Sequence, residues 1–317
     1  MEQFESAAHY PLMSQTKTDT SQPHHSGYVA LIGRPNAGKS TLLNRLVGEK
    51  IAIVSNKPQT TRHKIQGVIT RPKGQVVLVD TPGVHKPGYL LNRRMMAAVH
   101  DALDGVDLVC LIRDASVSTG NGDRFVLDLI KQSQKPALLF LNKTDKLADK
   151  SKLLPLMEWY GGEYEWRSVV PISALNGDMV DVVLDQMIQN LPEGEAIFAD
   201  DELTDQPVRM MVAEIVREKI LQAMGDELPY VTAVVTEKFD EERADLTRIH
   251  CAIFVERQTQ KKIIIGHGAA QLKEIGTLAR RDIEHLIGKR CHLQLFVKVE
   301  AGWRDRNALL DDLGIKQ

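Results

Sequence analysis

A glycine-rich loop is the feature of this sequence whose residue types and spacing most directly predict chemistry. Gly33 to Ser40 reads G-R-P-N-A-G-K-S and lies between an apolar run, Tyr28 to Ile32, and a helical stretch, Thr41 to Val47. Glycines allow successive backbone N–H groups to approach a polyphosphate at a helix N-terminus. In this pattern Lys39 reaches the β- and γ-phosphates, and the Ser40 hydroxyl binds Mg²⁺. The loop alone fits ATP and GTP equally well.

Two later motifs predict which base is bound. Asn142 to Asp145 reads N-K-T-D, and the Asp145 carboxylate can accept hydrogen bonds from both N1–H and the exocyclic amine of guanine. Adenine offers no donor at either position. We expect Asn142 to tie the loop together near the base edge, and the stem of the following lysine to lie over the ring. Ser173 to Leu175 reads S-A-L, where the Ala174 N–H is placed to meet guanine O6. Together these motifs favour guanine.

Two polar segments predict the surroundings of the metal and the terminal phosphate. Asp80 to Gly83 reads D-T-P-G; the aspartate is expected to hold Mg²⁺ through water, and the Gly83 N–H to sense the γ-phosphate. In isolation this motif would be a simple turn. Gln59 to His63 reads Q-T-T-R-H and is expected to order around the metal and the γ-phosphate. Thr61 is the expected ligand, and Thr60 is the alternative.

The elements that must position these motifs follow from short apolar runs that alternate with helical patterns, which is typical of a mostly parallel sheet covered by helices. Each run is followed by polar or glycine-containing sequence. This places the motifs at the carboxyl ends of the strands, where open α/β sheets bind ligands. The runs are Tyr28 to Ile32, Gln75 to Val79, Asp107 to Ile112, Ala137 to Leu141 and Val169 to Ile172.

Length and composition set the outer limits. A chain of 317 residues favours two domains, and its net charge of -2 requires any nucleic-acid surface to be local. Cys110, Cys251 and Cys291 lie far apart, so we interpret them as buried thiols in a reducing cytosol. No run of 18 apolar residues and no signal-peptide pattern occurs, which predicts a soluble protein that stays inside the cell.

Changes in composition predict the domain boundaries. Residues 1–26 are polar, lack a hydrophobic period and are expected to form a flexible tail, in which the adjacent histidines are incidental. A nucleotide-binding domain is predicted over residues 27–192. Residues 193–206 form an acidic linker with six acidic residues and no basic one, and residues 207–317 form the second domain. There the patterns predict a helix over 208–224, strands over 231–236 and 248–256, a helix over 268–288 and a strand over 291–299.

The motifs G-R-P-N-A-G-K-S, Q-T-T-R-H, D-T-P-G, N-K-T-D and S-A-L, in this order and ahead of a small α/β domain, resemble the Era family of bacterial GTPases. The similarity runs from about Gly27 to Leu313. It implies GTP hydrolysis with Mg²⁺. It also implies that the second domain is a KH domain that binds the 3′ end of small-subunit ribosomal RNA during ribosome maturation.

The resemblance also bears on catalysis. Asn36 is similar to the asparagine with which related GTPases hold K⁺ beside the phosphates, a cation that can replace the charge of an arginine finger; a plain loop asparagine is the alternative. Val84 follows the D-T-P-G motif, where Ras-like enzymes place a glutamine that orients water. A valine cannot do this, so slow intrinsic turnover is expected. Peripheral contact with the inner face of the cell membrane is kept open.

KH domains clamp a nucleic-acid backbone at a G-x-x-G loop that opens a helix. The candidate loop is Gly266 to Ala269, which has alanine in place of the last glycine and could equally be a plain helix start. The alanine fits if its φ is helical, although it narrows the approach for a phosphate. From Arg257 to Arg306 the chain has eleven basic and five acidic residues, an excess that favours a phosphate-backbone partner.

The sequence thus predicts an α/β fold: a P-loop GTPase domain with a mostly parallel sheet, followed by an α+β KH-type domain. Two other functions stay open: an RNA-binding scaffold with a purely structural nucleotide site, and a GTPase that acts on a protein or membrane partner. The residues assigned to GTP are Gly33, Arg34, Pro35, Asn36, Ala37, Gly38, Lys39, Ser40, Thr41, Asp80, Thr81, Pro82, Gly83, Asn142, Lys143, Thr144, Asp145, Ser173, Ala174 and Leu175. Catalytic roles are assigned to Lys39, Thr61, Gly83 and Asn36, metal binding to Ser40, Thr61 and Asp80, and RNA binding to Lys261, Lys262, Gly266, His267, Gly268, Ala269, Lys273 and Arg280.

Overall fold

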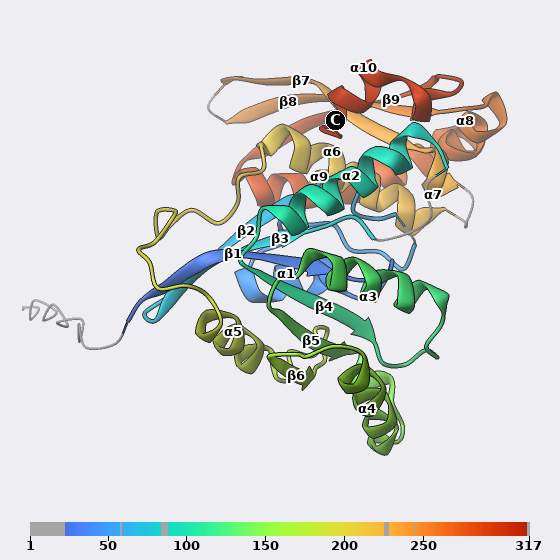
Figure 1. Ribbon diagram of the computed structural model, residues 1–317. Coiled ribbons are helices and arrows are strands. Elements are labelled where there is room, and N and C mark those ends of the chain that lie inside the picture. The colour runs from blue at the N-terminus through green and yellow to red at the C-terminus, as the bar shows by residue number, and fades with distance from the viewer. Residues whose placement is uncertain (1–22, 58, 84–87, 225–227, 244, 316–317) are drawn as a thin grey trace, which may run out of the picture.

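The computed structural model describes residues 23–57, 59–83, 88–224, 228–243 and 245–315, which form two domains (Figure 1). Val84, which was expected to replace a water-orienting glutamine, lies outside the described residues.

The first domain is built on a six-stranded sheet with the order β2-β3-β1-β4-β5-β6. All neighbouring strands are parallel except β2 and β3, which form an antiparallel hairpin at one edge. The predicted mostly parallel sheet is therefore confirmed, and β2 is an addition to the five predicted strands. The strands are β1 (His25–Ile32), β2 (Ile65–Arg71), β3 (Gly74–Asp80), β4 (Leu108–Asp114), β5 (Ala137–Asn142) and β6 (Ser168–Pro171).

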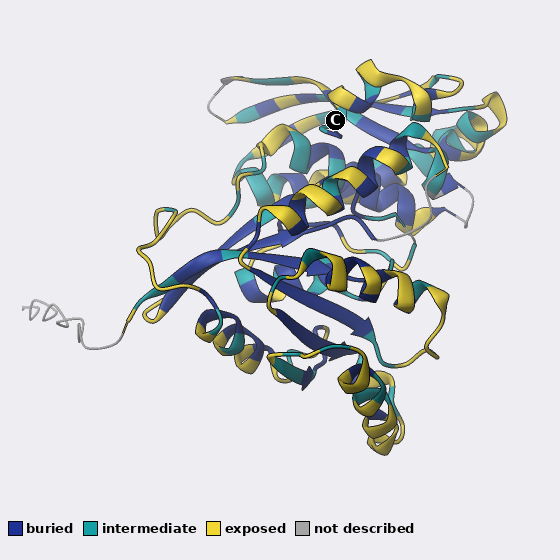
Figure 2. Ribbon diagram, viewed as in Figure 1, coloured by how far each residue is buried: buried dark blue, intermediate teal, exposed yellow. Residues whose placement is uncertain are grey.

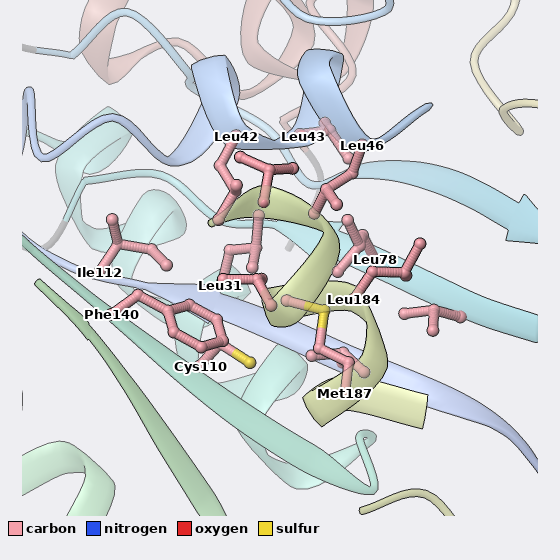
Figure 3. Close-up of a cluster of buried hydrophobic side chains, with 14 of the residues drawn as sticks. Leu31, Leu42, Leu43, Leu46, Leu78, Cys110, Ile112, Phe140, Leu184 and Met187 are labelled. Carbon is pink, nitrogen blue, oxygen red and sulfur yellow. The ribbon is translucent and has the colours of Figure 1, made fainter. Parts of the chain in front are cut away.

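Helices cover both faces of this sheet. Successive residues of β1 point to opposite faces, so that Leu31 packs with α1 and α5, whereas Ile32 packs with α2, α3 and α4. Figure 3 shows part of the first of these two cores, in which leucines of α1 lie in one cluster with Phe140, Leu184 and Met187. The helices are α1 (Lys39–Val47), α2 (Leu90–Asp104), α3 (Asn121–Ser133), α4 (Leu153–Glu163) and α5 (Val180–Gln189), with short 3₁₀ turns η1 (Thr144–Lys146) and η2 (Lys150–Lys152).

The first strand begins at His25, inside the segment that was expected to be a flexible tail. His25 and Ser26 pair with Gly74 and Gln75 of β3. The junction between the first domain and the acidic linker holds these residues in place, because the Ser26 N–H donates to the Pro192 carbonyl at 3.1 Å and the Gly194 N–H to the His24 carbonyl at 3.0 Å. Contacts with a segment far along the chain thus extend β1, and the local polar composition gives no signal of them.

The second domain is an α+β unit whose three-stranded sheet has the order β7-β8-β9. β7 and β8 are antiparallel, β8 and β9 parallel, and apolar residues of α6 and α9 form a core with the sheet. The predicted elements are present; α7, α8 and the elements after β9 were not predicted. The bounds are α6 (Val208–Ala223), α7 (Leu228–Val231), β7 (Ala233–Arg243), β8 (Leu246–Val255), α8 (Gln258–Ile265), η3 (His267–Ala269), α9 (Ala270–Ile287), β9 (Arg290–Val299), η4 (Trp303–Asp305) and α10 (Asn307–Asp312).

The two domains share a buried interface. Leu91 and Met95 of α2 pack against Trp303, Leu310 and Ile315 near the C-terminus. Figure 2 shows the burial pattern: the central strands of the first sheet are buried along most of their length, whereas the helices expose one side. Among the helices that the structure describes, none is both long and apolar enough to span a bilayer.

Candidate nucleotide-binding site and RNA-binding groove

The glycine-rich loop connects β1 to α1 at the carboxyl edge of the sheet, as predicted. The Lys39 ammonium is buried and donates to the Gly33 carbonyl at 3.2 Å and to the Arg34 carbonyl at 3.4 Å. Burial lowers the pKa of Lys39, and the nearby Asp80 carboxylate opposes this shift. Gly38 has a φ of 100°, and a Cβ there would lie 2.2 Å from Asn142 Nδ2. The close packing of the loop therefore requires glycine.

Three oxygen-bearing side chains meet beside the loop. The Ser40 hydroxyl donates to Asp80 Oδ2 at 2.6 Å and lies 2.9 Å from the Thr61 hydroxyl, which is 3.3 Å from the same carboxylate oxygen. Burial raises the pKa of Asp80, although Lys39 and the two hydroxyls oppose the shift. Asp80 Oδ1 is buried without a hydrogen-bond partner in the described part of the chain. An unpaired carboxylate oxygen beside two hydroxyls suits a hard divalent cation such as Mg²⁺.

The two neighbouring threonines point in different directions. The Thr60 hydroxyl donates to the Lys57 carbonyl at 2.6 Å and lies 2.9 Å from the Ser55 hydroxyl, within its own loop. The structure therefore brings Thr61, and not Thr60, to Ser40 and Asp80.

The N-K-T-D and S-A-L motifs meet at the ends of β5 and β6. The Ser173 hydroxyl donates to Asp145 Oδ1 at 2.6 Å, which fixes the orientation of this exposed carboxylate. Asn142 is 2% exposed; its amide donates to the Ala37 carbonyl at 2.8 Å and accepts from the Ala174 N–H at 3.0 Å. Asn142 thus ties three loops together, as expected. Because Asn142 already engages the Ala174 N–H, guanine O6 would have to share this donor.

Two side chains that support these motifs, Asp114 and Arg45, were not identified from the sequence. Asp114 lies at the end of β4, and its Oδ2 is 2.7 Å from the Lys143 ammonium. Burial would raise the pKa of Asp114, but hydrogen bonds from Lys143 and Ser116 outweigh it and hold the pKa below its usual value. Arg45 of α1 donates to the carbonyls of Ala174 and Leu175 and so supports the S-A-L loop. The position of Asp114 at a strand end could have indicated its role, whereas nothing local marks Arg45.

These motifs line one cavity of about 570 Å³. Most of the residues assigned to GTP line it, but Gly33, Asp80, Thr81, Pro82, Thr144 and Ser173 do not. The hydroxyl of Thr81 donates to the Leu31 carbonyl and that of Thr144 to the Ile172 carbonyl, so these two side chains brace the loops. Further residues of the chain before and within the predicted switch segment also line the cavity, namely Ile53, Val54, Ser55, Asn56, Gln59, Thr60 and Thr61. Only the last three of these were in the predicted switch segment.

Two other residues of the glycine-rich loop, Asn36 and Arg34, are held by contacts with neighbouring segments of the first domain. Asn36 has a φ of 62°, and its amide donates to the Asn56 carbonyl at 2.5 Å, which joins the glycine-rich loop to the segment before Thr61. Arg34 Nη1 donates to the buried Asp123 at 2.9 Å. Arg34 therefore anchors the loop to α3.

A second cavity lies in the second domain between α9 and β9. Its volume is about 360 Å³, and Ala269, Lys273, Arg280 and His292 are among the residues that line it. Lys273, Arg280 and His292 are exposed, so the groove offers cationic and imidazole groups to solvent. Of the residues assigned to RNA, the groove contains Ala269, Lys273 and Arg280, while Lys261 and Lys262 lie on α8 ahead of the loop.

The backbone of the G-x-x-G-like loop differs from the expectation for its alanine. Gly266 and Gly268 have φ values of 72° and 56°, and Ala269 has a φ of 62°, in the left-handed region. The condition under which alanine was expected to fit, a helical φ, is therefore not met at Ala269. A left-handed residue with a Cβ costs about 1–2 kcal/mol, which the rest of the loop must offset. The predicted helix begins after the loop, at Ala270.

Comparisons with known proteins match two separate parts of the chain to two different families. Residues 28–143 match a family described as 50S ribosome-binding GTPase, and residues 227–304 match the KH domain. GTPase Era of Trichlorobacter lovleyi is 45% identical over 291 residues, which cover 92% of this chain and 98% of that protein. The chain belongs to the Era family of GTPases. The predicted GTPase domain and the predicted KH domain are both confirmed.

Two solved structures of Era agree over nearly the whole chain. A crystal structure of Aquifex aeolicus Era bound to GDP and AlF₄⁻ is 36% identical, has a TM-score of 0.89 and covers 92% of this chain and 100% of its own. A crystal structure of Era in complex with MgGDPNP and nucleotides 1506–1542 of 16S ribosomal RNA is also 36% identical, has a TM-score of 0.90 and covers 93% and 100%. The arrangement of the two domains is thus that of Era.

Proposed function

We propose that this Era family GTPase binds GTP with Mg²⁺, hydrolyses it to GDP and phosphate, and uses the nucleotide state to control binding to the 3′ end of small-subunit ribosomal RNA during small-subunit assembly. The exposed groove between α9 and β9, in a fold that matches an RNA-bound Era over its whole length, is the observation that carries the RNA part. The local excess of basic residues supports it.

The roles of the catalytic residues follow from their positions. Lys39, whose ammonium donates to the Gly33 and Arg34 carbonyls of the loop, would reach the β- and γ-phosphates of a bound nucleotide. Ser40, Thr61 and Asp80 would hold Mg²⁺, which neutralises charge on the phosphates. The Gly83 N–H would contact the γ-phosphate. Fixed donors of this kind act by position and charge, so no side-chain base is needed.

RNA affinity of the full chain tests this proposal. Neutralising Lys261, Lys262 and Lys273 together should weaken binding of a 16S 3′-terminal RNA oligonucleotide at physiological salt. Each lost phosphate contact should also make the slope of log K against log salt concentration shallower by about 0.7 for a single strand. Binding is measured by fluorescence anisotropy over a salt series with a GTP analogue bound.

The matched control neutralises three exposed lysines of the first domain, Lys73, Lys150 and Lys152, which makes the same change in net charge. RNA affinity should change little in this control variant. GTP affinity should stay unchanged in both variants. Equal losses of RNA affinity in the two triple variants would show that only net charge matters, and would contradict the assignment of these three lysines to the RNA site.

Asn36 supports a further part of the proposal, namely a K⁺ ion beside the phosphates. Its amide joins the glycine-rich loop to Asn56, so a cation held there would lie next to both segments that face the nucleotide. Hydrolysis is therefore expected to be faster in K⁺ than in Na⁺ at equal ionic strength, by about tenfold or more, since a well-placed cation stabilises the transition state. Asn36→Ala should remove this difference. Equal rates in both salts would reject K⁺ and leave the GTPase assignment intact.

A cytoplasmic location and peripheral contact with the inner face of the cell membrane stay predictions from the sequence. Fractionation of cells into soluble and membrane pools, with and without a salt wash, distinguishes the two.

A further inference from the structure

The segment Gln59 to His63 is held from two sides. On the nucleotide side, the Thr61 hydroxyl lies beside Ser40 and Asp80. On the other side, α6 of the second domain provides Arg217, whose guanidinium donates to the backbone carbonyls of Gln59, at 3.4 Å, and Thr60. The peptide that leads into Thr61 is therefore held by a side chain from the second domain.

Arg217 is itself fixed in place. It is 1% exposed, and Glu214, one helical turn before it, accepts from its Nε at 2.7 Å and from Nη2 at 2.6 Å. Burial would raise the pKa of Glu214, but the charge and hydrogen bonds of Arg217 hold it below its usual value. A fork–fork pair of this kind fixes the plane of the guanidinium. The carbonyls of Gln59 and Thr60 thus meet a donor of fixed position.

Other contacts nearby also join the chain around Thr61 to the second domain. The Arg62 side chain donates to the Thr232 carbonyl at 2.8 Å and lies over the Trp303 ring at 5.5 Å. The Val54 N–H donates to Glu218 Oε1 at 2.9 Å. These contacts cross the domain interface on both sides of Thr61, so the second domain restricts the backbone conformations that Thr61 can adopt.

We infer that Arg217, oriented by Glu214, is a positioning residue for GTP hydrolysis: from the second domain it holds the Gln59–Thr60 carbonyls so that the Thr61 hydroxyl stays beside Ser40 and Asp80. The inference rests on the proposed GTPase function. It places a residue essential for efficient turnover in a helix that precedes the KH match, which begins at residue 227. Because the loss of a buried donor leaves the carbonyls unpaired, the segment should move when Arg217 is altered.

Arg217→Lys tests the inference, because lysine keeps the charge but loses the planar fork. Arg94→Lys is the matched control: Arg94 is an equally buried interdomain arginine that bonds Asn307, Asp311 and the Ile315 carbonyl, away from residues 59–63. Three quantities are measured in the full chain: the single-turnover hydrolysis rate at saturating GTP, the affinity for GDP, and amide hydrogen exchange of residues 59–63 without nucleotide.

Arg217→Lys should lower the hydrolysis rate about 10- to 100-fold, the loss expected when a reacting geometry shifts by about 1 Å. It should speed exchange of residues 59–63 and leave GDP affinity within twofold, because GDP lacks the γ-phosphate that this segment senses. Arg94→Lys should leave all three quantities near those of the unsubstituted protein. If Arg217→Lys does not fold, Glu214→Gln, which loosens the same guanidinium, is expected to show the same pattern more weakly.

Equal hydrolysis rates in the two arginine variants, whether both normal or both slow, would overturn the positioning role. A rate loss in Arg217→Lys that comes with an equal loss of GDP affinity would overturn it too, because it would indicate general damage to the domain. These results differ from failure of the proposed function, in which the unsubstituted chain would not hydrolyse GTP.

Discussion

The nucleotide site and the RNA groove solve recognition in opposite ways. Lys39, Asp80 and Asn142 are buried and bound to backbone or side-chain partners, whereas Lys273 and Arg280 of the groove are exposed. A buried, hydrogen-bonded site discriminates between ligands because a wrong group leaves polar atoms unpaired. An exposed basic surface attracts phosphates in a way that depends on salt. The first domain is thus built for specificity by geometry, and the second for contact along a backbone.

The largest expected effect is a loss of base discrimination in the nucleotide site, where recognition depends on geometry. Asp145→Asn places an amide donor opposite the guanine amine, whereas xanthine offers a carbonyl at the same position. The ratio of GTP affinity to xanthosine triphosphate affinity should fall by on the order of 10⁴-fold. Competition binding with both nucleotides measures it. Ser173 keeps an acceptor in the variant, so the loop itself should persist.

Asp149→Asn is the control for this prediction, because Asp149 is exposed, lies four residues further on and only caps a short 3₁₀ turn through Ser151. Its ratio of affinities should equal that of the unsubstituted protein. An unchanged ratio in Asp145→Asn would contradict the assignment of the base-binding residue.

A smaller difference is expected when a glycine is changed to alanine in each of the two regions. Gly38→Ala would bring a Cβ to 2.2 Å from Asn142 Nδ2 at a φ of 100°, whereas Gly268→Ala, at a φ of 56°, meets no atom within 4 Å. Gly38→Ala should lower GTP affinity on the order of 100-fold, from backbone strain and a broken buried hydrogen bond. Gly268→Ala should lower the free energy of unfolding by about 1 kcal/mol and leave GTP affinity unchanged. Calorimetry measures both quantities, and similar GTP affinities in the two variants would refute the contrast.

Much of the nucleotide site could be predicted because its motifs are short and local. Each lies directly after a buried strand, and parallel strands bring their carboxyl ends together, so sequence order alone placed Lys39, Asp80 and Asn142 at one edge. The orientation of each hydroxyl was not predictable in this way. Thr60 and Thr61 have the same side chain, and only contacts with Ser55 and Asp80 separate them.

The features that sequence reasoning missed depend on contacts between distant segments. β1 is lengthened by the linker, Arg45 supports a loop about 130 positions away, and Arg217 reaches Thr60 from another domain. No local period or motif marks such residues. The left-handed backbone of Ala269 was likewise not predictable, since the surrounding loop overrides the usual preference of alanine for a negative φ.

The central claim is that the two regions act as one switch, and the RNA affinity of the full chain in three nucleotide states tests it most directly. A GTP analogue should tighten RNA binding relative to GDP, by a factor in the usual range of about 5 to 150, because the segment that is expected to contact the γ-phosphate is also held by Arg217. Linkage requires the RNA to tighten binding of the analogue relative to GDP by the same factor. Equal RNA affinity with the GTP analogue, with GDP and without nucleotide would contradict the account and leave two independent domains on one chain.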